Sequence, residues 1–167
     1  MTFLPADLYA RIEESMPIAC VDFVPVREVD GRREIGLILR DSPHGRVWCH
    51  LGGRIQRGET IAVAIRRHCV DTLGLEPVLP LNPQPAYVYE WFPHSFAPTD
   101  GTVFGDDPRK HAIGLSFTIA LEGDPQPQEE ALDFAFFPTD ALPDDLWPGC
   151  RVLFERMGLV RGEKSLG

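Results

Sequence analysis

Long apolar segments and closely spaced cysteines are both missing from this sequence. No run of about 18 apolar residues occurs, so we expect no membrane span. The first ten residues have no basic segment followed by an apolar one, so we expect no secretory signal. No CxxC pair occurs among the four cysteines, which favours reduced thiols in a cytoplasmic protein.

A zinc site is one alternative for the thiols. It would require the pairs Cys49-His50 and His68-Cys69 to meet at one ion. Ligands adjacent in sequence are not the usual spacing of structural zinc, so we do not favour this alternative.

A basic excess is missing as well. The formal net charge is −9, which argues against DNA or RNA polymers as the main partner. A small phosphorylated ligand remains compatible with that charge, because a local arginine cluster can bind it. The 167 residues, 44% of them hydrophobic, predict a single domain over 1–167 with a core of its own.

The hydrophobic pattern predicts helices at both ends and in the middle of the chain, with strands between them. A period of about four residues and a glycine after the last turn make Thr60–Leu73 the clearest helix. The order helix, strands, helix, strands, helix predicts an α/β domain with a mixed sheet between helices. The predicted helices are 5–16, 60–73 and 147–157, and the predicted strands are 18–29, 33–40, 47–51, 86–92, 111–121 and 131–138.

The segment from Gly52 to Leu75 resembles the signature of the Nudix hydrolases. It matches that family's box at Gly53, Glu59, Arg67, Cys69, Gly74 and Leu75. It departs at His68, Asp71 and Thr72, where the family has three glutamates. The resemblance implies the Nudix fold, with helices on both sides of a mixed sheet. It also implies that Glu59 and Arg67 pair to brace the loop against the helix.

The altered helix face bears directly on metal binding. Residues 68, 71 and 72 lie within about 100° of one another on a helix, where three carboxylates would make a Mg²⁺ site. Of these, only Asp71 is an acid here. Either a weakened Mg²⁺ or Mn²⁺ site or no metal at all is expected, and Asp71 would alternatively pair with Arg67 one turn earlier.

A closer resemblance is to the GDP-mannose mannosyl hydrolases, which form homodimers. It implies that Asp22, Arg54 and Arg67 support the reaction, and that Arg40 contacts substrate. It places the metal on the carbonyl of Gly52 and near Glu130. That branch's glutamate ligand falls on Thr72 and its general-base histidine near Ala131, so both pieces are absent.

The segment Asp106–His111 combines two acids, two bases and an imidazole in a long polar loop. His111 is a candidate acid or base, because the imidazole pKa lies near neutrality. Arg109 is a candidate diphosphate clamp. The alternative is a polar surface loop with internal ion pairs.

Three hypotheses follow from these patterns. The first is hydrolysis of a nucleoside diphosphate derivative, such as a nucleotide sugar, with Asp71 or Glu130 holding the metal. The second is a binding module that keeps the ligand and has lost hydrolysis, and the third is a protein-interaction unit. The first two require Arg54 and Arg67 to meet at one cavity beside the double glycine.

Overall fold

The computed structural model describes residues 4–162. It contains three α-helices, one short 3₁₀ helix and nine strands within that range. In chain order these are α1 (Ala6–Ser15), β1 (Ile18–Val29), β2 (Arg32–Ser42), β3 (Gly45–Cys49), β4 (Leu51–Arg54), α2 (Ile61–Leu73), β5 (Pro77–Val78), β6 (Tyr87–Phe92), η1 (His94–Phe96), β7 (Gly105–Asp106), β8 (Ala112–Leu121), β9 (Asp133–Pro138) and α3 (Cys150–Arg156).

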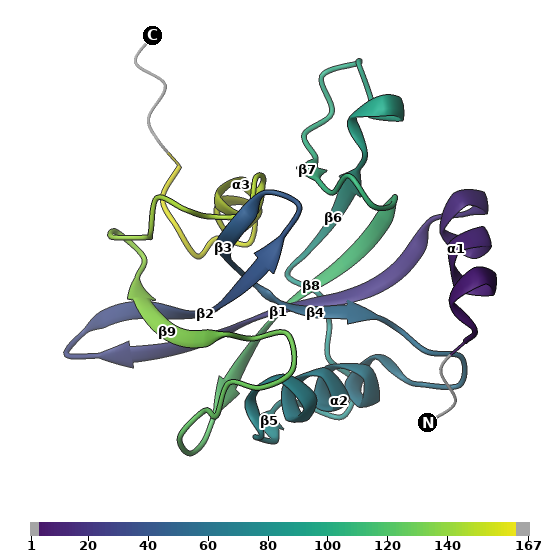
Figure 1. Cartoon of the computed structure of the whole chain (residues 1–167). Coiled ribbons are helices and arrows are strands. Elements are labelled where there is room, and N and C mark those ends of the chain that lie inside the picture. Colours follow the sequence, from purple (N-terminus) through teal and green to yellow (C-terminus); the bar gives the residue numbers. More distant parts are fainter. Residues whose placement is uncertain (1–3, 163–167) are drawn as a thin grey trace, which may run out of the picture.

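Strand β1 is the centre of a curled mixed sheet (Figure 1). Its first half pairs in parallel with β8 and antiparallel with β4, and its last residues pair antiparallel with β2. The order along the sheet is β3-β2-β1-β8-β6-β7, with β9 beside β2 and β5 beside β8. Helices α2 and α3 lie on opposite sides of β1 and β4 in Figure 1, so the predicted α/β architecture is confirmed.

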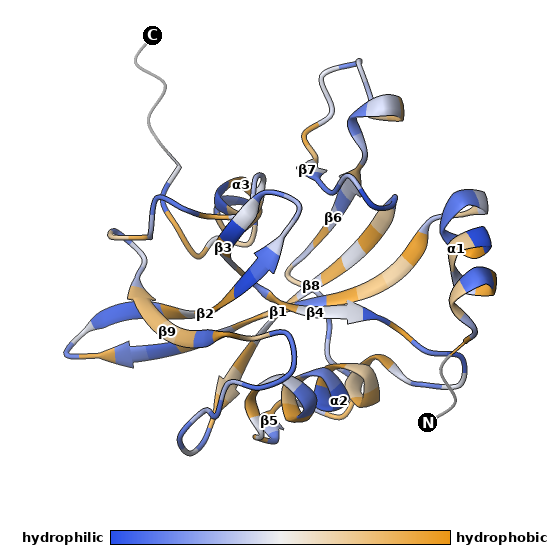
Figure 2. Ribbon diagram, viewed as in Figure 1, coloured by the Kyte–Doolittle hydropathy of each residue, from blue (hydrophilic) through white to orange (hydrophobic). Residues whose placement is uncertain are grey.

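The apolar residues of β1 explain why it is central. Strands covered on both faces carry nearly continuous apolar runs, and residues 20–25 of β1 are all buried. The core joins Phe23 of β1 to Ile65 and Leu73 of α2 and to Phe117 of β8. Figure 2 shows β1 and β8 largely hydrophobic, whereas α1 and α2 carry both colours. Within the described part of the chain, no helix is long and apolar enough to cross a membrane.

Helix α2 begins and ends as its sequence predicts. The Thr60 side chain accepts a hydrogen bond from the amide of Val63 at 3.3 Å, which caps the first turn. Gly74 ends the helix with φ of 66°, in the left-handed region that favours glycine. The buried face includes Ile65, Cys69 and Thr72.

Two predicted elements differ from the structure. The strand expected at 47–51 is two strands, β3 and β4, separated at His50. The closing helix begins at Cys150 rather than Trp147, because Gly149 has φ of 99° and the Trp147 amide bonds to Trp48 of β3. The short elements β5, β7 and η1 were not predicted, since two or three residues carry no periodic pattern.

Candidate functional site

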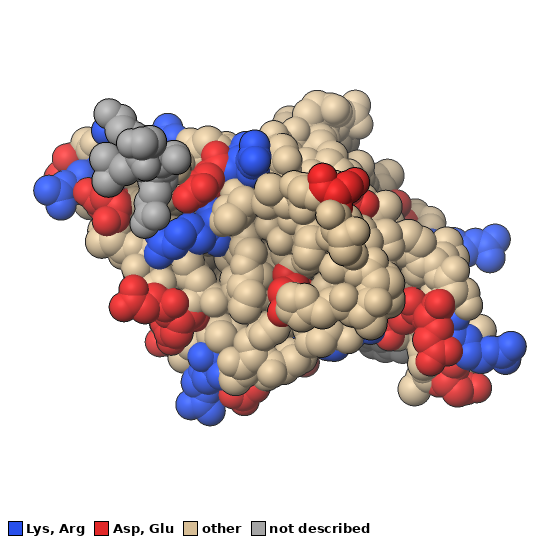
Figure 3. All heavy atoms as spheres, turned by 90° about the horizontal axis from the view of Figure 1, so that it is seen from above, with Lys and Arg blue, Asp and Glu red and all other residues tan. Residues whose placement is uncertain are grey.

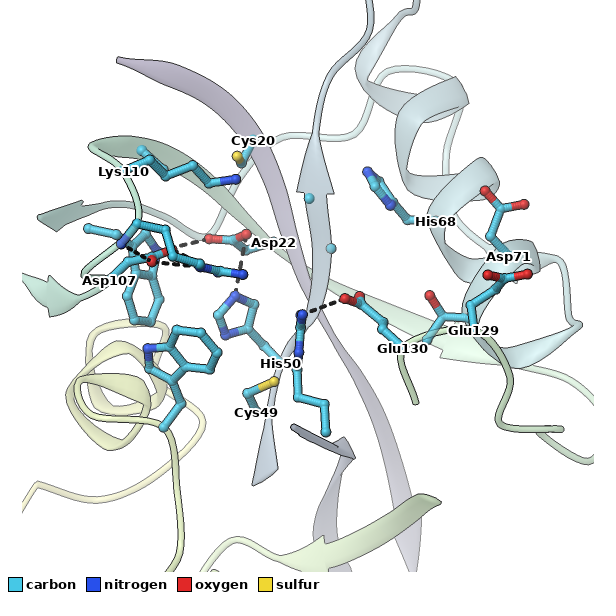
Figure 4. Close-up of a pocket in the computed structure, with 18 of the residues that line it drawn as sticks. Cys20, Asp22, Cys49, His50, His68, Asp71, Asp107, Lys110, Glu129 and Glu130 are labelled. Carbon is cyan, nitrogen blue, oxygen red and sulfur yellow. Dashed lines mark hydrogen bonds and ion pairs between the residues drawn. The ribbon is translucent and has the colours of Figure 1, made fainter. Parts of the chain in front are cut away.

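A cavity of about 700 Å³ opens between β1, β4, α2 and the segment 107–112 (Figure 4). Its lining includes Asp22, Arg40, Gly52, Arg67, Asp71, Arg109 and Glu130, which are seven of the nine residues predicted for the site. The lining also includes residues outside that predicted set, among them His50 and Trp147.

Asp22 lies inside the core strand β1 and is only 5% exposed. Trp91 of β6 donates its indole N–H to Asp22 Oδ2 at 3.2 Å, and His50 Nε2 lies 3.3 Å from Oδ1. Gly114, on the neighbouring strand β8, leaves the space for this carboxylate, because a Cβ there would collide with Oδ2. The sheet register therefore holds Asp22 at the floor of the cavity.

His50 is the functional candidate that sequence reasoning missed. Its ring stacks on Trp91 with centroids 5.2 Å apart, and its Nδ1 lies 3.5 Å from Cys150 Sγ. Burial lowers the pKa of His50, but the Asp22 carboxylate outweighs it and raises the pKa to about 10. His50 is therefore an imidazolium at neutral pH, held beside the buried Asp22. The available signal was Asp22 itself, because an acid in a buried strand requires a partner.

Glu59 and Arg67 form the predicted brace. Arg67 donates from Nε to Glu59 Oε1 at 2.6 Å and from Nη2 to Oε2 at 2.9 Å. Arg67 Nη2 also donates to the Arg54 carbonyl at 3.1 Å. The hydrogen bonds from Arg67 lower the pKa of Glu59. The alternative pair of Asp71 with Arg67 is not formed within residues 4–162, where no ion pair joins them.

Arg40 of β2 and Glu130, which precedes β9, form an ion pair across the cavity, 2.6 Å between Nη1 and Oε2. The guanidinium of Arg40 also lies 5.8 Å from the centre of the Trp147 ring. Arg40 Nε is buried and has no hydrogen-bond acceptor among residues 4–162. The hydrogen-bonding capacity of the Arg40 guanidinium is therefore only partly used by the described residues.

The segment 106–111 is divided between the cavity and its surroundings. Asp107 accepts from Arg109 Nε and Nη2, both at 2.9 Å, and Arg109 lies 5.1 Å from the Trp147 ring centre. Lys110 lines the cavity and pairs with Glu13 of α1 at 3.7 Å. Internal ion pairs were the expected alternative for this loop, and the Asp107–Arg109 pair is one of them.

The placement of His111 corrects its predicted catalytic role. Its ring stacks on Phe92 with centroids 4.1 Å apart, and Nε2 lies 3.6 Å from Glu90. Both neighbours belong to β6, and His111 is not part of the cavity lining. Consecutive residues entering a strand face opposite sides, so Lys110 and Ala112 reach the cavity while His111 turns away.

The placement of Arg54 is a second correction. Its guanidinium lies 4.3 Å from the centre of the Tyr9 ring and lines a separate cavity of about 340 Å³ beside α1. Gly53 faces the main cavity, and side chains alternate along β4, so Arg54 points the other way. Its carbonyl alone contacts the site, through Arg67 and His68. The expectation that Arg54 and Arg67 meet at one cavity is wrong, so both nucleotide hypotheses fail in the form that required it. A nucleotide site here has to rest instead on the cations that do line the main cavity, Arg40, Arg67, Arg109 and Lys110.

The residues on the α2 face do not fit a preformed divalent-cation site. Gly52, Asp71 and Glu130 all line the cavity, but Glu130 is held by Arg40. The His68 ring packs against Gly53 and its Nε2 donates to the Arg54 carbonyl at 3.1 Å. Burial, above all, lowers the pKa of His68. Across residues 4–162, no three His, Cys, Asp or Glu side chains are grouped to hold a metal ion, and this includes the zinc alternative.

Comparison with solved structures identifies the class of this fold as Nudix. A possible asymmetric diadenosine tetraphosphate hydrolase from Jonesia denitrificans is 28% identical, with a TM-score of 0.74 over 89% of this chain and 99% of that one. A MutT Nudix hydrolase from Burkholderia pseudomallei is 22% identical, with a TM-score of 0.65 over 85% and 98%. The Nudix domain of Shewanella oneidensis NrtR, solved with ADP ribose, is 15% identical, with a TM-score of 0.61 over 92% and 96%.

The chain itself belongs to the family described as domain of unknown function DUF4916, whose model matches residues 2–147. The predicted Nudix fold is thus confirmed, and the matched range contains every residue of the cavity lining.

Proposed function

We propose that this protein binds a nucleoside diphosphate derivative in the cavity beside β4. The observation that carries the proposal is the meeting of phosphate-binding and ring-stacking groups in one cavity of a Nudix fold. Arg40, Arg109 and Lys110 supply the cations, and Trp91 and Trp147 supply aromatic rings. The volume of about 700 Å³ lies in the usual range for small-molecule sites.

The cationic, aromatic and acidic groups of the cavity have different roles in this proposal. Guanidinium groups suit phosphate oxygens, which they contact with two parallel N–H donors. Trp147, which is 5% exposed, lies near both guanidinium groups and keeps Arg40 and Arg109 at the cavity wall. Asp22 lies at the floor of the cavity, and each carboxylate oxygen, already contacted once, can accept one further hydrogen bond, such as one from a sugar hydroxyl.

Binding is favoured over hydrolysis because α2 has few carboxylates that could hold a metal ion. A metal ion supplies several kcal/mol of transition-state stabilisation in metal-assisted hydrolysis. Here a single acid, Asp71, remains on that face, Thr72 is 4% exposed, and Glu130 is engaged by Arg40. The protein keeps the ligand pocket of the fold and lacks the usual means of holding Mg²⁺ or Mn²⁺.

Hydrolysis is the second candidate, and the Asp22–His50 pair is the observation that favours it. A buried imidazolium beside a carboxylate can donate a proton to a leaving oxygen. Arg67, which also lines the cavity, would stabilise negative charge there. The solved structures of similar fold include proteins named as hydrolases, which is consistent with this candidate.

The quaternary state and compartment are proposals as well. The resemblance to the mannosyl hydrolases supports a homodimer. The four cysteines are all free and buried, which supports a reducing, cytoplasmic compartment. On the face seen in Figure 3, acidic and basic side chains are interspersed, which supports a small-molecule ligand over a nucleic acid polymer.

The decisive experiment combines thermal shift and product release on a panel of nucleotide sugars, ADP-ribose and dinucleoside polyphosphates. A ligand at a hundred times its Kd should stabilise the fold by about 2.7 kcal/mol. A shift without product supports the binding function, and a shift with product supports hydrolysis. No shift with any compound would refute both.

A pair of arginine variants locates the binding. Arg40→Gln should weaken binding at least tenfold, about 1.4 kcal/mol. Arg46→Gln is the matched control, because Arg46 lies on the adjacent strand β3, is 63% exposed and pairs only with Asp41 among the described residues. Equal affinities for the two variants would place the ligand elsewhere.

A further inference from the structure

Every arginine that reaches the cavity already has an acidic partner, but the partners differ in how they are held. Arg109 is bound at two nitrogens by Asp107, which is 8% exposed at its side chain. Arg67 is bound at two nitrogens by Glu59, which is 10% exposed. These two pairs are bidentate and fixed, so a ligand cannot easily replace their carboxylates.

The Arg40–Glu130 pair is of a different kind. It is a single contact through Nη1, while Arg40 Nε is left without an acceptor. Glu130 is 34% exposed and belongs to a connecting segment, next to Glu129, whose φ is 54°. A glutamate in the left-handed region of φ is uncommon. Here Glu129 has that conformation and directly precedes Glu130, whose side chain points into the cavity (Figure 4).

We propose that Glu130 competes with the ligand's phosphate for Arg40, so that a diphosphate enters by displacing this carboxylate and requires no divalent cation. The displaced carboxylate is close enough to the surface to be hydrated. The phosphate then accepts hydrogen bonds from Arg40 Nη1 and from Arg40 Nε, which has no acceptor among residues 4–162. Arg40 thereby supplies the positive charge that a metal would otherwise supply. This inference rests on the proposed function of the cavity.

A metal-ligand role for Glu130, which the resemblance implies, makes the opposite prediction. If Glu130 held a cation that bridges to phosphate, removing its charge would weaken phosphate binding. If Glu130 competes with phosphate, removing its charge strengthens binding. The sign of one measurement therefore separates the two roles.

The test uses inorganic pyrophosphate and Mn²⁺ as separate probes on the full chain. Isothermal titration of pyrophosphate is carried out in EDTA and in excess Mg²⁺, for the wild type, Glu130→Gln and Arg40→Gln. We expect Glu130→Gln to bind about threefold more tightly, in line with the modest strength of a partly exposed pair. We expect Arg40→Gln to bind pyrophosphate at least tenfold more weakly than the wild type. We expect each protein to have the same pyrophosphate affinity in EDTA as in Mg²⁺. Titration with Mn²⁺ alone, followed by electron paramagnetic resonance, should show no saturable site below millimolar concentration.

Glu122→Gln is the matched control. It removes the same charge from an exposed residue outside the cavity, so it should leave pyrophosphate affinity unchanged. Weaker or equal binding by Glu130→Gln, loss of binding in EDTA, or one Mn²⁺ bound per chain and lost in Glu130→Gln would each overturn the inference. So would an absence of pyrophosphate binding. Pyrophosphate binding without any nucleotide binding would refute the proposed function alone.

Discussion

At the scale of single residues, the Asp22–His50 pair is the most constrained feature of the molecule. Asp22 is buried and the His50 side chain is 15% exposed, and each has a second partner, Trp91 for Asp22 and Cys150 for His50. Such a network is costly when one member is removed, because the remaining charge has no counterpart.

Asp22→Asn should therefore lower the free energy of unfolding by about 3 kcal/mol. Urea denaturation of the two proteins measures it. Asp41→Asn is the control, since Asp41 is 72% exposed and should stay within about 0.5 kcal/mol of the wild type. A loss at Asp22 no larger than at Asp41 would contradict the buried pair.

The same pair predicts how stability depends on pH. Burial lowers the pKa of His50, but the charge of Asp22 raises it by more. The pKa of His50 in the folded state is therefore about 10, above the ordinary value of 6.5. The folded state therefore binds its proton more tightly than the unfolded state, and the gain is complete below pH 6.5. It is lost progressively as the pH rises from 6.5 to 10.

Urea unfolding at several pH values in that window measures this loss. The wild type should lose more stability between pH 6.5 and 10 than His50→Gln, which has no proton to release there. Identical slopes for the two proteins would refute the assigned protonation.

At the scale of elements, the loop and helix of residues 53–74 form one rigid unit. Its N-terminal side is fixed by the Glu59–Arg67 brace, and its C-terminal end depends on Gly74. The Cβ of any other residue at 74 would have ordinary contacts, none closer than 3.7 Å. The cost of substitution is therefore conformational rather than steric.

Gly74→Ala should lower the free energy of unfolding by about 1 kcal/mol, because alanine is strained at positive φ. Gly74→Asn should lose less, since asparagine tolerates the left-handed region. Thermal or urea unfolding of both variants tests this order. Equal losses would indicate that packing, not backbone conformation, sets the cost.

At the scale of the whole molecule, several apolar side chains remain exposed. Leu8 of α1 is 43% exposed and Met16, just after it, is 58% exposed. Helix α1 has no buried residue, although Tyr9 and Ile12 pack partly on the core. Burial of such a face in a second copy is consistent with the proposed homodimer.

Sedimentation velocity should accordingly give twice the chain mass of 18.7 kDa. Leu8→Glu combined with Met16→Glu should shift the protein toward monomer if α1 forms the interface. A single species at the monomer mass over micromolar concentrations would refute the homodimer.

The sequence by itself determined the longer helices and strands and the Nudix fold. The Nudix fold and the Glu59–Arg67 pair were expected from the resemblance of the segment 52–75 to the family signature. Local signals were sufficient for the elements: the four-residue period and terminal glycine of α2, and the apolar run of β1. Those signals depend on neighbours within one or two turns or on the side-chain period of a strand.

Only the tertiary structure decided which polar residues share the cavity. The alternation of side chains in β4 turned Arg54 away, and the entry into β8 turned His111 away. The register of β1 with its neighbours brought Asp22 of β1, Trp91 of β6 and His50, at the junction of β3 and β4, together. Contacts between residues far apart in sequence leave no local pattern, so the acid partner of Arg40 was visible only in the folded chain.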